Sequence, residues 1–181
     1  CDKLVSLNMT PVMWGGTVQE YVNSLLTALA ADCDGKEQIE LNYNYDGLAT
    51  TLIESFEGDT PVLAEPQTIT AKNGYKLYQT EGRYYALKFL ERLISNPDYY
   101  NSADATNNAF EHTMAQDMYL LSKYGDVRKR TAMLVEGNWW QKESSGTFLA
   151  MEAENGEEDS MYSRRFGMMP LPKPTAEKVG E

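Results

Sequence analysis

The fold is decided by residues 131–140, which read TAMLVEGNWW. The four residues 132–135 are continuously apolar, and such a short run is typical of a strand that is buried on both faces. Gly137, Trp139 and Trp140 follow directly after it. Because open α/β sheets bind ligands at the carboxyl ends of their strands, this order indicates a ligand-binding loop.

The adjacent indoles favour a sugar as the ligand. The axial C–H groups of a pyranose form an apolar surface that suits the flat face of an indole, while the hydroxyls stay free for polar groups. Side chains of neighbouring residues in an extended segment point to opposite faces, so only one ring can stack, and we expect it to be Trp139. The polar neighbours that could bind hydroxyls are Glu136, Asn138, Gln141 and Glu143. The alternative is that one indole belongs to the hydrophobic core and the other lies at its rim, without a ligand.

Three earlier segments have apolar residues at helical spacing, and they cover residues 17–34, 82–96 and 107–123. The first begins with a capping-box sequence, TVQE, and stops at Gly35. The second is ended by Pro97. In the third, we expect the apolar face to be formed by Phe110, Met114, Met118 and Leu121.

The remaining segments predict short strands and loops. Residues 4–7 and 165–169 are expected to be strands, and the acid-rich residues 152–159 a solvated loop. Residues 36–80 are expected to be mostly loop, with a helical turn or two within 48–56 and a hairpin that turns at Asn73-Gly74. Pro170, Pro172 and Pro174 predict an extended exit without regular pairing. Helices that alternate with short strands predict an α/β lobe.

Composition excludes several classes of protein. The 181 residues contain 16 Lys and Arg against 27 Asp and Glu, a net charge of −11, which excludes binding to nucleic acid through neutralisation of phosphates. The longest apolar runs are far shorter than the roughly 18 residues that a membrane-spanning helix needs. Two cysteines, Cys1 and Cys33, are too few for a disulfide scaffold.

Further candidate site residues carry weaker signals. Trp14 precedes Gly15-Gly16 and a helix, whose first amides could accept an anion or a hydroxyl, so Trp14 is a candidate ligand residue, with an ordinary turn as the alternative. His112 is the only histidine and has no Cys or second His near it in sequence. The acids of 152–159 do not match a calcium loop. We therefore predict no metal site, no cofactor and no catalytic residue.

The run at 131–140 is similar to the Ala-Met, apolar, Gly-x-Trp run of the extracellular solute-binding proteins of carbohydrate ABC transporters (family 1, the maltose-binding-protein-like class). Other segments that resemble this family, in the same order along the chain, are Thr10-Pro11-Val12, residues 85–94, Ala115-Gln116 and residues 165–172. In that family the Trp of Gly-x-Trp commonly stacks on the bound sugar. The resemblance therefore gives Trp139 the role that the stacking argument gave it independently.

The resemblance implies one α/β lobe of a two-lobed, periplasmic-binding-protein-like fold, with helices packed on a short sheet and incomplete in this chain. Residues 1–169 would be the second lobe, with a loop- and hairpin-rich insertion at 36–80, and residues 170–181 a hinge or exit segment toward the first lobe. The function implied is that of the substrate-binding component of an ABC importer, which captures a sugar or oligosaccharide between its lobes.

The implied partners are the sugar and the ABC permease subunits, and the implied location is extracellular or periplasmic. A membrane-anchored bacterial lipoprotein would touch the membrane only through its lipid, for which Cys1 is one possible acceptor. The protein would not be an enzyme, and this chain alone would bind sugar weakly. The alternatives are a carbohydrate-active enzyme or recognition module with a carboxylate and Trp cleft, and an interaction domain whose Trp pair is core.

Overall fold

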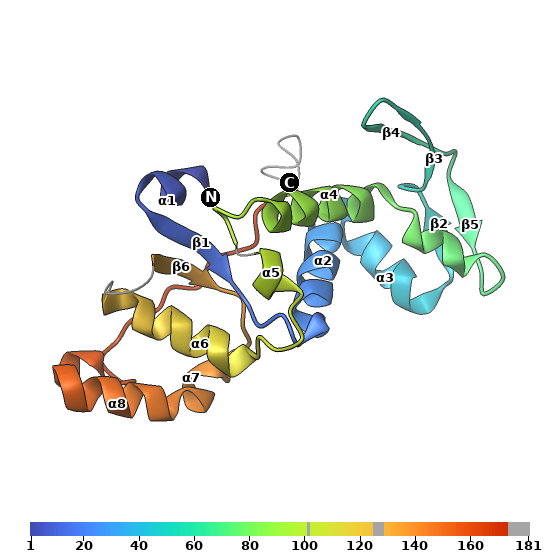
Figure 1. The fold of residues 1–181 in the computed structure, drawn as a ribbon. Coiled ribbons are helices and arrows are strands. Elements are labelled where there is room, and N and C mark those ends of the chain that lie inside the picture. The colour runs from blue at the N-terminus through green and yellow to red at the C-terminus, as the bar shows by residue number, and fades with distance from the viewer. Residues whose placement is uncertain (101, 125–128, 174–181) are drawn as a thin grey trace. The chain divides into compact units, whose positions relative to one another are not determined.

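The computed structural model describes residues 1–100, 102–124 and 129–173 (Figure 1). The chain divides into two compact units, the first made of Cys1–Val22 and Arg92–Met169, and the second of Asn23–Glu91 and Pro170–Glu181. Helices and strands occur in both, so the chain is a mixed α/β protein, as the sequence predicted. Within the described ranges, no helix has the length and apolar character needed to cross a membrane.

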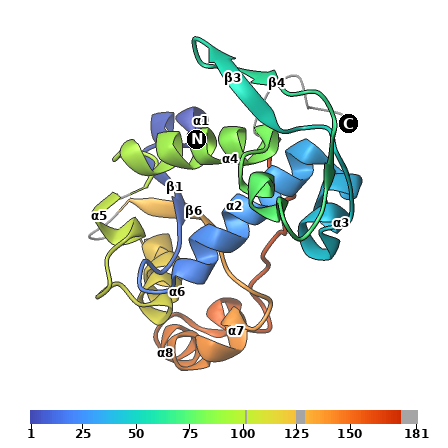
Figure 2. The same ribbon diagram turned by 90° about the vertical axis from the view of Figure 1, so that its right-hand side faces the viewer.

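The first unit contains a parallel pair of strands, β1 (Met9–Met13) and β6 (Arg130–Leu134). They lie side by side in both ribbon views, with Thr10 opposite Thr131 and Val12 opposite Met133 (Figures 1 and 2). The strand predicted at 132–135 is thus confirmed within two residues. It is only partly buried, however, because the described residues add no further strand to this sheet.

Helices make up most of the rest of the first unit. They are α1 (Asp2–Ser6), α5 (Ser102–Ala105), α6 (His112–Leu121), α7 (Trp140–Glu143) and α8 (Ser145–Asn155), with short 3-10 helices η2 (Ser122–Tyr124) and η3 (Glu157–Asp159). The strand predicted at 4–7 was wrong. Residues 4–6 belong to α1, where the Val5 amide donates to the Cys1 carbonyl, because a short apolar run does not distinguish strand from helix.

Helix α6 begins later than predicted and turns a different face inward. Its buried residues are Ala115, Gln116 and Leu120, whereas Met114 and Leu121 are exposed. The expected face included Phe110, which is buried but lies in the loop before the helix. The periodicity of a few apolar residues therefore fixed neither the start of α6 nor its orientation.

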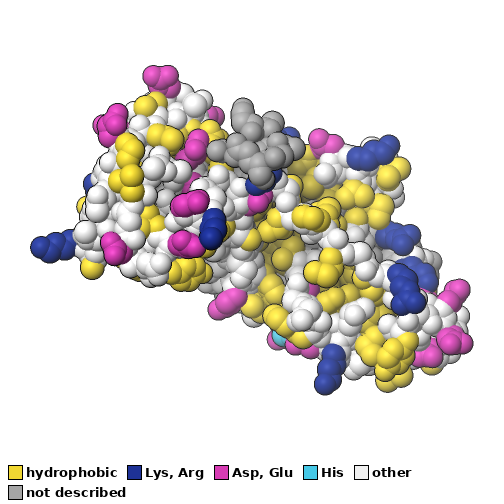
Figure 3. All heavy atoms as spheres, turned by 180° about the vertical axis from the view of Figure 1, so that it is seen from behind, with side chains coloured by type: hydrophobic (Ala, Val, Ile, Leu, Met, Phe, Trp, Pro, Cys, Tyr) yellow, Lys and Arg dark blue, Asp and Glu magenta, His cyan; other side chains and the backbone are white. Residues whose placement is uncertain are grey.

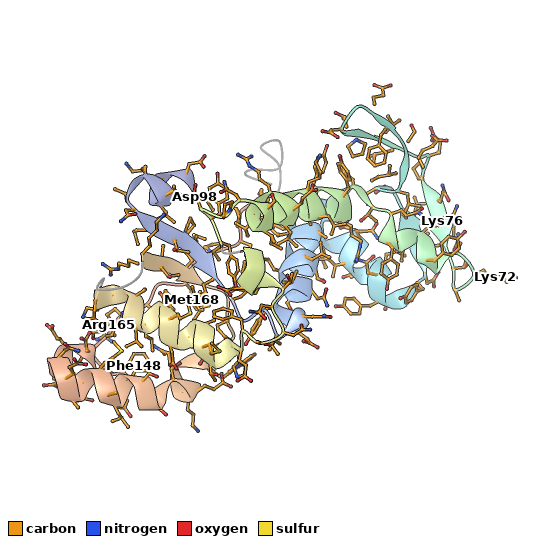
Figure 4. The ribbon with its side chains drawn as sticks, in the orientation of Figure 1. Lys72, Lys76, Asp98, Phe148, Arg165 and Met168 are labelled. Atoms are coloured by element: carbon orange, nitrogen blue, oxygen red, sulfur yellow. The ribbon has the colours of Figure 1, made fainter. Side chains whose placement is uncertain are left out.

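A cluster of large apolar side chains joins α6 to α8. Phe148 of α8, labelled in Figure 4, packs with Leu120 and Met151. Partly buried aromatic side chains, including Trp140 and Phe166, pack against these three residues. This packing explains why residues 152–155 are helical and not part of a loop, although residues 153–158 are exposed to solvent as predicted. The apolar residues of α8 carry the helix as far as Asn155 before η3 follows.

The acid-rich run also contains a fully buried carboxylate. Asp159 accepts hydrogen bonds from the Lys123 ammonium and the Tyr124 hydroxyl of η2. The strand expected at 165–169 is absent as well, since residues 164–173 form neither helix nor strand. Regular pairing is missing at Pro170 and Pro172, as predicted, and Pro174 lies outside the described residues.

The longer segment of the second unit, Asn23–Glu91, starts within α2 (Gln19–Asp34) and ends within α4 (Glu81–Ser95). Both helices were predicted within two residues of these bounds, and Gly35 ends α2 with a φ of 86°. Between them lie α3 (Lys36–Asn44), β2 (Gly47–Ala49), β3 (Ile53–Glu57), β4 (Thr60–Leu63), β5 (Gln67–Ile69) and the 3-10 helix η1 (Gly74–Tyr78). The segment expected to be mostly loop is therefore largely structured.

The pairing in this segment also differs from the prediction. Strand β2 pairs antiparallel with β5, and β3 forms a hairpin with β4 that turns at Gly58-Asp59, so residues 48–56 are not helical. The predicted hairpin at Asn73-Gly74 was wrong. The Asn73 side chain instead accepts from the Thr70 amide and donates to the Thr68 carbonyl, and the next residues form η1, which buries Leu77.

Candidate functional site

The candidate site is built on the segment that follows β6. The Val135 amide donates to the Met13 carbonyl at 2.9 Å and continues the β1–β6 pairing by one step. Residues 136 and 137 then leave the sheet, a turn forms at 138 and 139, and α7 begins at Trp140. The Gly-x-Trp residues thus lie at the carboxyl end of a parallel strand, where the sequence predicted them.

Trp139 is 55% exposed, and its indole lies against the backbone of Gly137. A Cβ atom built at Gly137 would lie 2.2 Å from Cη2 of the indole and 2.4 Å from Cζ2, far inside van der Waals contact. Glycine is therefore required at this position for the ring to occupy its place. The spacing Gly-x-Trp combines an aromatic face that solvent can reach with a backbone surface that supports it.

Trp140 occupies a different environment from its neighbour. It is partly buried, and its ring lies edge-on to Phe166 and Tyr119, with centroids 5.0 and 5.8 Å away. The two rings therefore differ in burial, although the segment is not extended as predicted: Trp139 lies in a turn and Trp140 begins α7. Trp140 was also a predicted ligand residue, and the structure places it in the aromatic cluster between α6 and α8.

A hydrogen-bond network holds the carboxylate of Glu136 beside this loop. The Tyr21 hydroxyl of α2 donates to Glu136 Oε1 at 2.7 Å, and the Gln116 amide of α6 donates to the same oxygen at 3.0 Å. The Gly137 amide donates to Glu136 Oε2 at 3.0 Å. Burial, followed by the neighbouring Glu136 carboxylate, raises the pKa of Tyr21, so its hydroxyl stays protonated as a donor.

Gln116 links this carboxylate to a second one. Its side-chain nitrogen also donates to Glu143 Oε2 of α7 at 2.9 Å, and its side-chain oxygen accepts from the Ser144 hydroxyl at 2.8 Å. Gln116 is fully buried, so the two glutamates are anchored to a rigid point in the core. His112 Nε2 lies 3.9 Å from the same Glu143 oxygen. The network therefore fixes two carboxylates, which belong to residues three and four positions away from Trp139 in the sequence.

Trp14 is not a surface residue, and the prediction that it contacts ligand is corrected here. Its indole is 1% exposed, stacks on Tyr100 with ring centroids 4.1 Å apart, and donates from Nε1 to the Ala105 carbonyl. Gly15 and Gly16 are explained by packing, since added Cβ atoms would lie 2.6 Å from Cα of His112 and 1.9 Å from the Asp104 carbonyl oxygen. These glycines allow close approach of backbones.

Two of the residues in the network were missed as site residues from the sequence. Gln116 was noted only as part of an Ala-Gln pair, and Tyr21 only as a member of the apolar face of α2. A polar residue on the inner face of an otherwise apolar helix is the signal for Gln116. Of the other predicted polar residues, Asn138 is exposed, and Gln141 is partly buried on α7.

A separate hollow of about 480 Å³ lies in the first unit. Its lining comes from β1, β6, α5, α6 and the loops near them, including Phe110, Met114 and Met118. Neither Trp139 nor the two glutamates of the network line it. This hollow and the candidate site are thus different places on this unit.

Acidic side chains are spread over the face shown in Figure 3, in keeping with the net charge of −11. In the parts of the chain that the structure describes, no group of three or more His, Cys, Asp or Glu side chains is placed to hold a metal ion. No family model, curated protein or solved structure gives a significant match to this chain.

Proposed function

We propose that this chain is the sugar-binding part of a substrate-binding component of an ABC importer. The observation that carries the proposal is the exposed indole of Trp139, which is supported by Gly137 at the end of a parallel strand. The carboxylates of Glu136 and Glu143 are held close to it in sequence and by a common partner, Gln116. An aromatic face beside fixed hydrogen-bond acceptors is what a pyranose ring requires.

The proposed fold is one lobe of a two-lobed, periplasmic-binding-protein-like protein. A two-stranded parallel sheet supports this, because parallel sheets ordinarily have more strands and are covered on both faces. The sugar or oligosaccharide would bind between two lobes, and its extra contacts in the closed state would shift the population toward closure. ABC permease subunits would then receive it outside the cytoplasm, from a lipid-anchored protein.

A half-site of this kind binds weakly. A dissociation constant near 1 mM corresponds to a binding free energy of about −4 kcal/mol, which a single stacking surface with a few hydrogen bonds can supply. We therefore expect this chain alone to bind sugars with affinities of about 1 mM or weaker.

Calorimetry with a panel of neutral pyranoses and short oligosaccharides tests this proposal. Weak binding by the unaltered chain, its loss in Trp139→Ala, and its retention in Tyr162→Ala are the expected results. Tyr162 is a matched control because it is an exposed aromatic of the same unit that lies outside the network. Absence of heat with every saccharide, or equal loss in both variants, would contradict stacking on Trp139.

The Glu136 and Glu143 pair favours a second candidate, a carbohydrate-active enzyme. A glycosidase that retains configuration has two carboxyl groups about 5–5.5 Å apart, and these two share one amide nitrogen as a hydrogen-bond donor. Turnover of chromogenic glycosides that is abolished by Glu136→Gln or Glu143→Gln would establish the enzyme. Binding without turnover supports the transport function.

A further inference from the structure

We infer that the sugar bound at Trp139 carries an ammonium group on its ring, as an amino sugar does, and that the site binds acidic sugars more weakly. The inference rests on the proposed function, because it concerns which saccharide stacks on Trp139. Two independent observations carry it. They are the exposed indole on Gly137 and the pair of glutamates fixed by Gln116.

The hydrogen-bond donors of the network are all bonded to acceptors of the same network. The Tyr21 hydroxyl, the Gln116 amide and the Gly137 amide all donate to the glutamates. The Ser144 hydroxyl donates to Gln116. These four groups therefore have their protons committed within the protein, and the groups that they leave for a ligand are carboxylate oxygens. Each carboxylate oxygen has two lone pairs, so both glutamates can accept further hydrogen bonds.

The charges around the loop give the same preference. The Glu143 side chain is 38% exposed, and the His112 Nε2 atom lies 3.9 Å from its Oε2 atom. Lys142 is exposed on the same short helix, and among the described residues it forms no ion pair with Glu136 or Glu143. The raised pKa of Tyr21, caused by burial and then by Glu136, agrees with an acidic surrounding.

A ligand ammonium would gain from these carboxylates, and a ligand carboxylate would be repelled. At partly exposed positions a single charge pair is worth up to about 1 kcal/mol, which is about a fivefold change in affinity. A pyranose that carries an ammonium group should therefore bind about five times more tightly than the neutral sugar of the same ring. The corresponding uronic acid should bind about five times more weakly.

The test compares glucose, glucosamine and glucuronate, which share one ring and differ in charge. Each is titrated into the full chain while the Trp139 indole N–H resonance is followed by NMR, which detects weak binding. Glucosamine is expected to bind most tightly and glucuronate most weakly. Glu143→Gln should reduce the ratio of the glucosamine affinity to the glucuronate affinity. Glu154→Gln, which removes an exposed charge from α8, should leave that ratio unchanged.

The outcomes separate the two proposals. If no sugar moves the Trp139 resonance, the proposed function fails, and this inference fails with it. If all three bind equally, or if glucuronate binds best, the charge preference is wrong while stacking on Trp139 stands. If the preference survives Glu143→Gln unchanged, or changes as much with Glu154→Gln, the site glutamate is not its source.

Discussion

The two tryptophans of the loop after β6 have opposite energetic roles. Trp139 is mostly solvent-exposed, so its removal should cost the fold little, whereas Trp140 packs against Phe166 and near Phe148. Trp139→Ala is expected to change the free energy of unfolding by less than about 0.5 kcal/mol. Trp140→Ala should lower it by about 2–3 kcal/mol, since it leaves a cavity in the aromatic cluster.

Urea denaturation of the two variants measures this difference. Equal destabilisation by both would mean that Trp139 is a core residue, and the site would then lose its exposed aromatic face.

Gly137 provides a second prediction at the scale of single residues. In Gly137→Ala the new methyl group would collide with the indole, so the Trp139 ring must leave its position. We expect a changed Trp139 indole N–H resonance and at least a fivefold loss of sugar affinity, which is about 1 kcal/mol. Gly146→Ala is the matched control, because a Cβ atom there meets no other atom within 4 Å.

The same measurements decide the outcome. An unchanged indole resonance in Gly137→Ala, or an equal shift in Gly146→Ala, would show that Gly137 does not support the ring.

At the scale of elements, Asp159 connects η3 to η2 through Lys123 and Tyr124. Burial alone would raise the pKa of Asp159, but the hydrogen bonds from Lys123 and Tyr124 outweigh it and lower this pKa below its usual 3.8. A lowered pKa means that the ionised carboxylate stabilises the native state above pH 3.8, and that this contribution is lost as the pH falls below that value.

Asp159→Asn should therefore lower the free energy of unfolding by about 1–3 kcal/mol at pH 7, because buried donors lose a charged acceptor. The difference between the unaltered chain and the variant should shrink at pH 3. Urea denaturation at both pH values measures it. A difference that stays constant or grows on acidification would contradict the role of the ionised carboxylate.

Elements with strong local signals were predictable, and the others depended on tertiary contacts. Pro97 and Gly35 marked the ends of α4 and α2, and the apolar run before Gly137 marked β6. The orientation of α6 was not predictable, because it follows from the burial of Gln116, whose partners lie at Glu136 and Glu143. Local sequence does not contain those contacts.

The hairpin at Asn73-Gly74 failed for a similar reason. The Asn-Gly dipeptide is typical of a hairpin turn. Leu77, however, is buried with Leu41 and Ile69, and that burial favours a 3-10 helix over a strand. In the site, the exposed Trp139 was predictable from its spacing, whereas the buried Trp14 was not distinguishable from a surface tryptophan beside a glycine pair.

At the scale of the whole molecule, both units are mixed α/β, and exposed hydrophobic side chains are grouped in broad patches on the face in Figure 3. The described part of the first unit has a sheet of only two strands and a hollow with exposed Met114 in its lining. Both features agree with the proposal that this unit belongs to a larger lobe. The function still depends on Trp139, because that residue supplies the stacking surface.

The most direct test of the central claim is an NMR titration of the full chain with a neutral oligosaccharide, followed at the three indole N–H groups. The Trp139 resonance is expected to shift in a saturable manner at millimolar sugar, while that of the buried Trp14 stays fixed. A Trp139 resonance that stays unchanged up to saturating concentrations of every saccharide, or one that shifts no more than Trp14, would contradict sugar stacking at this site.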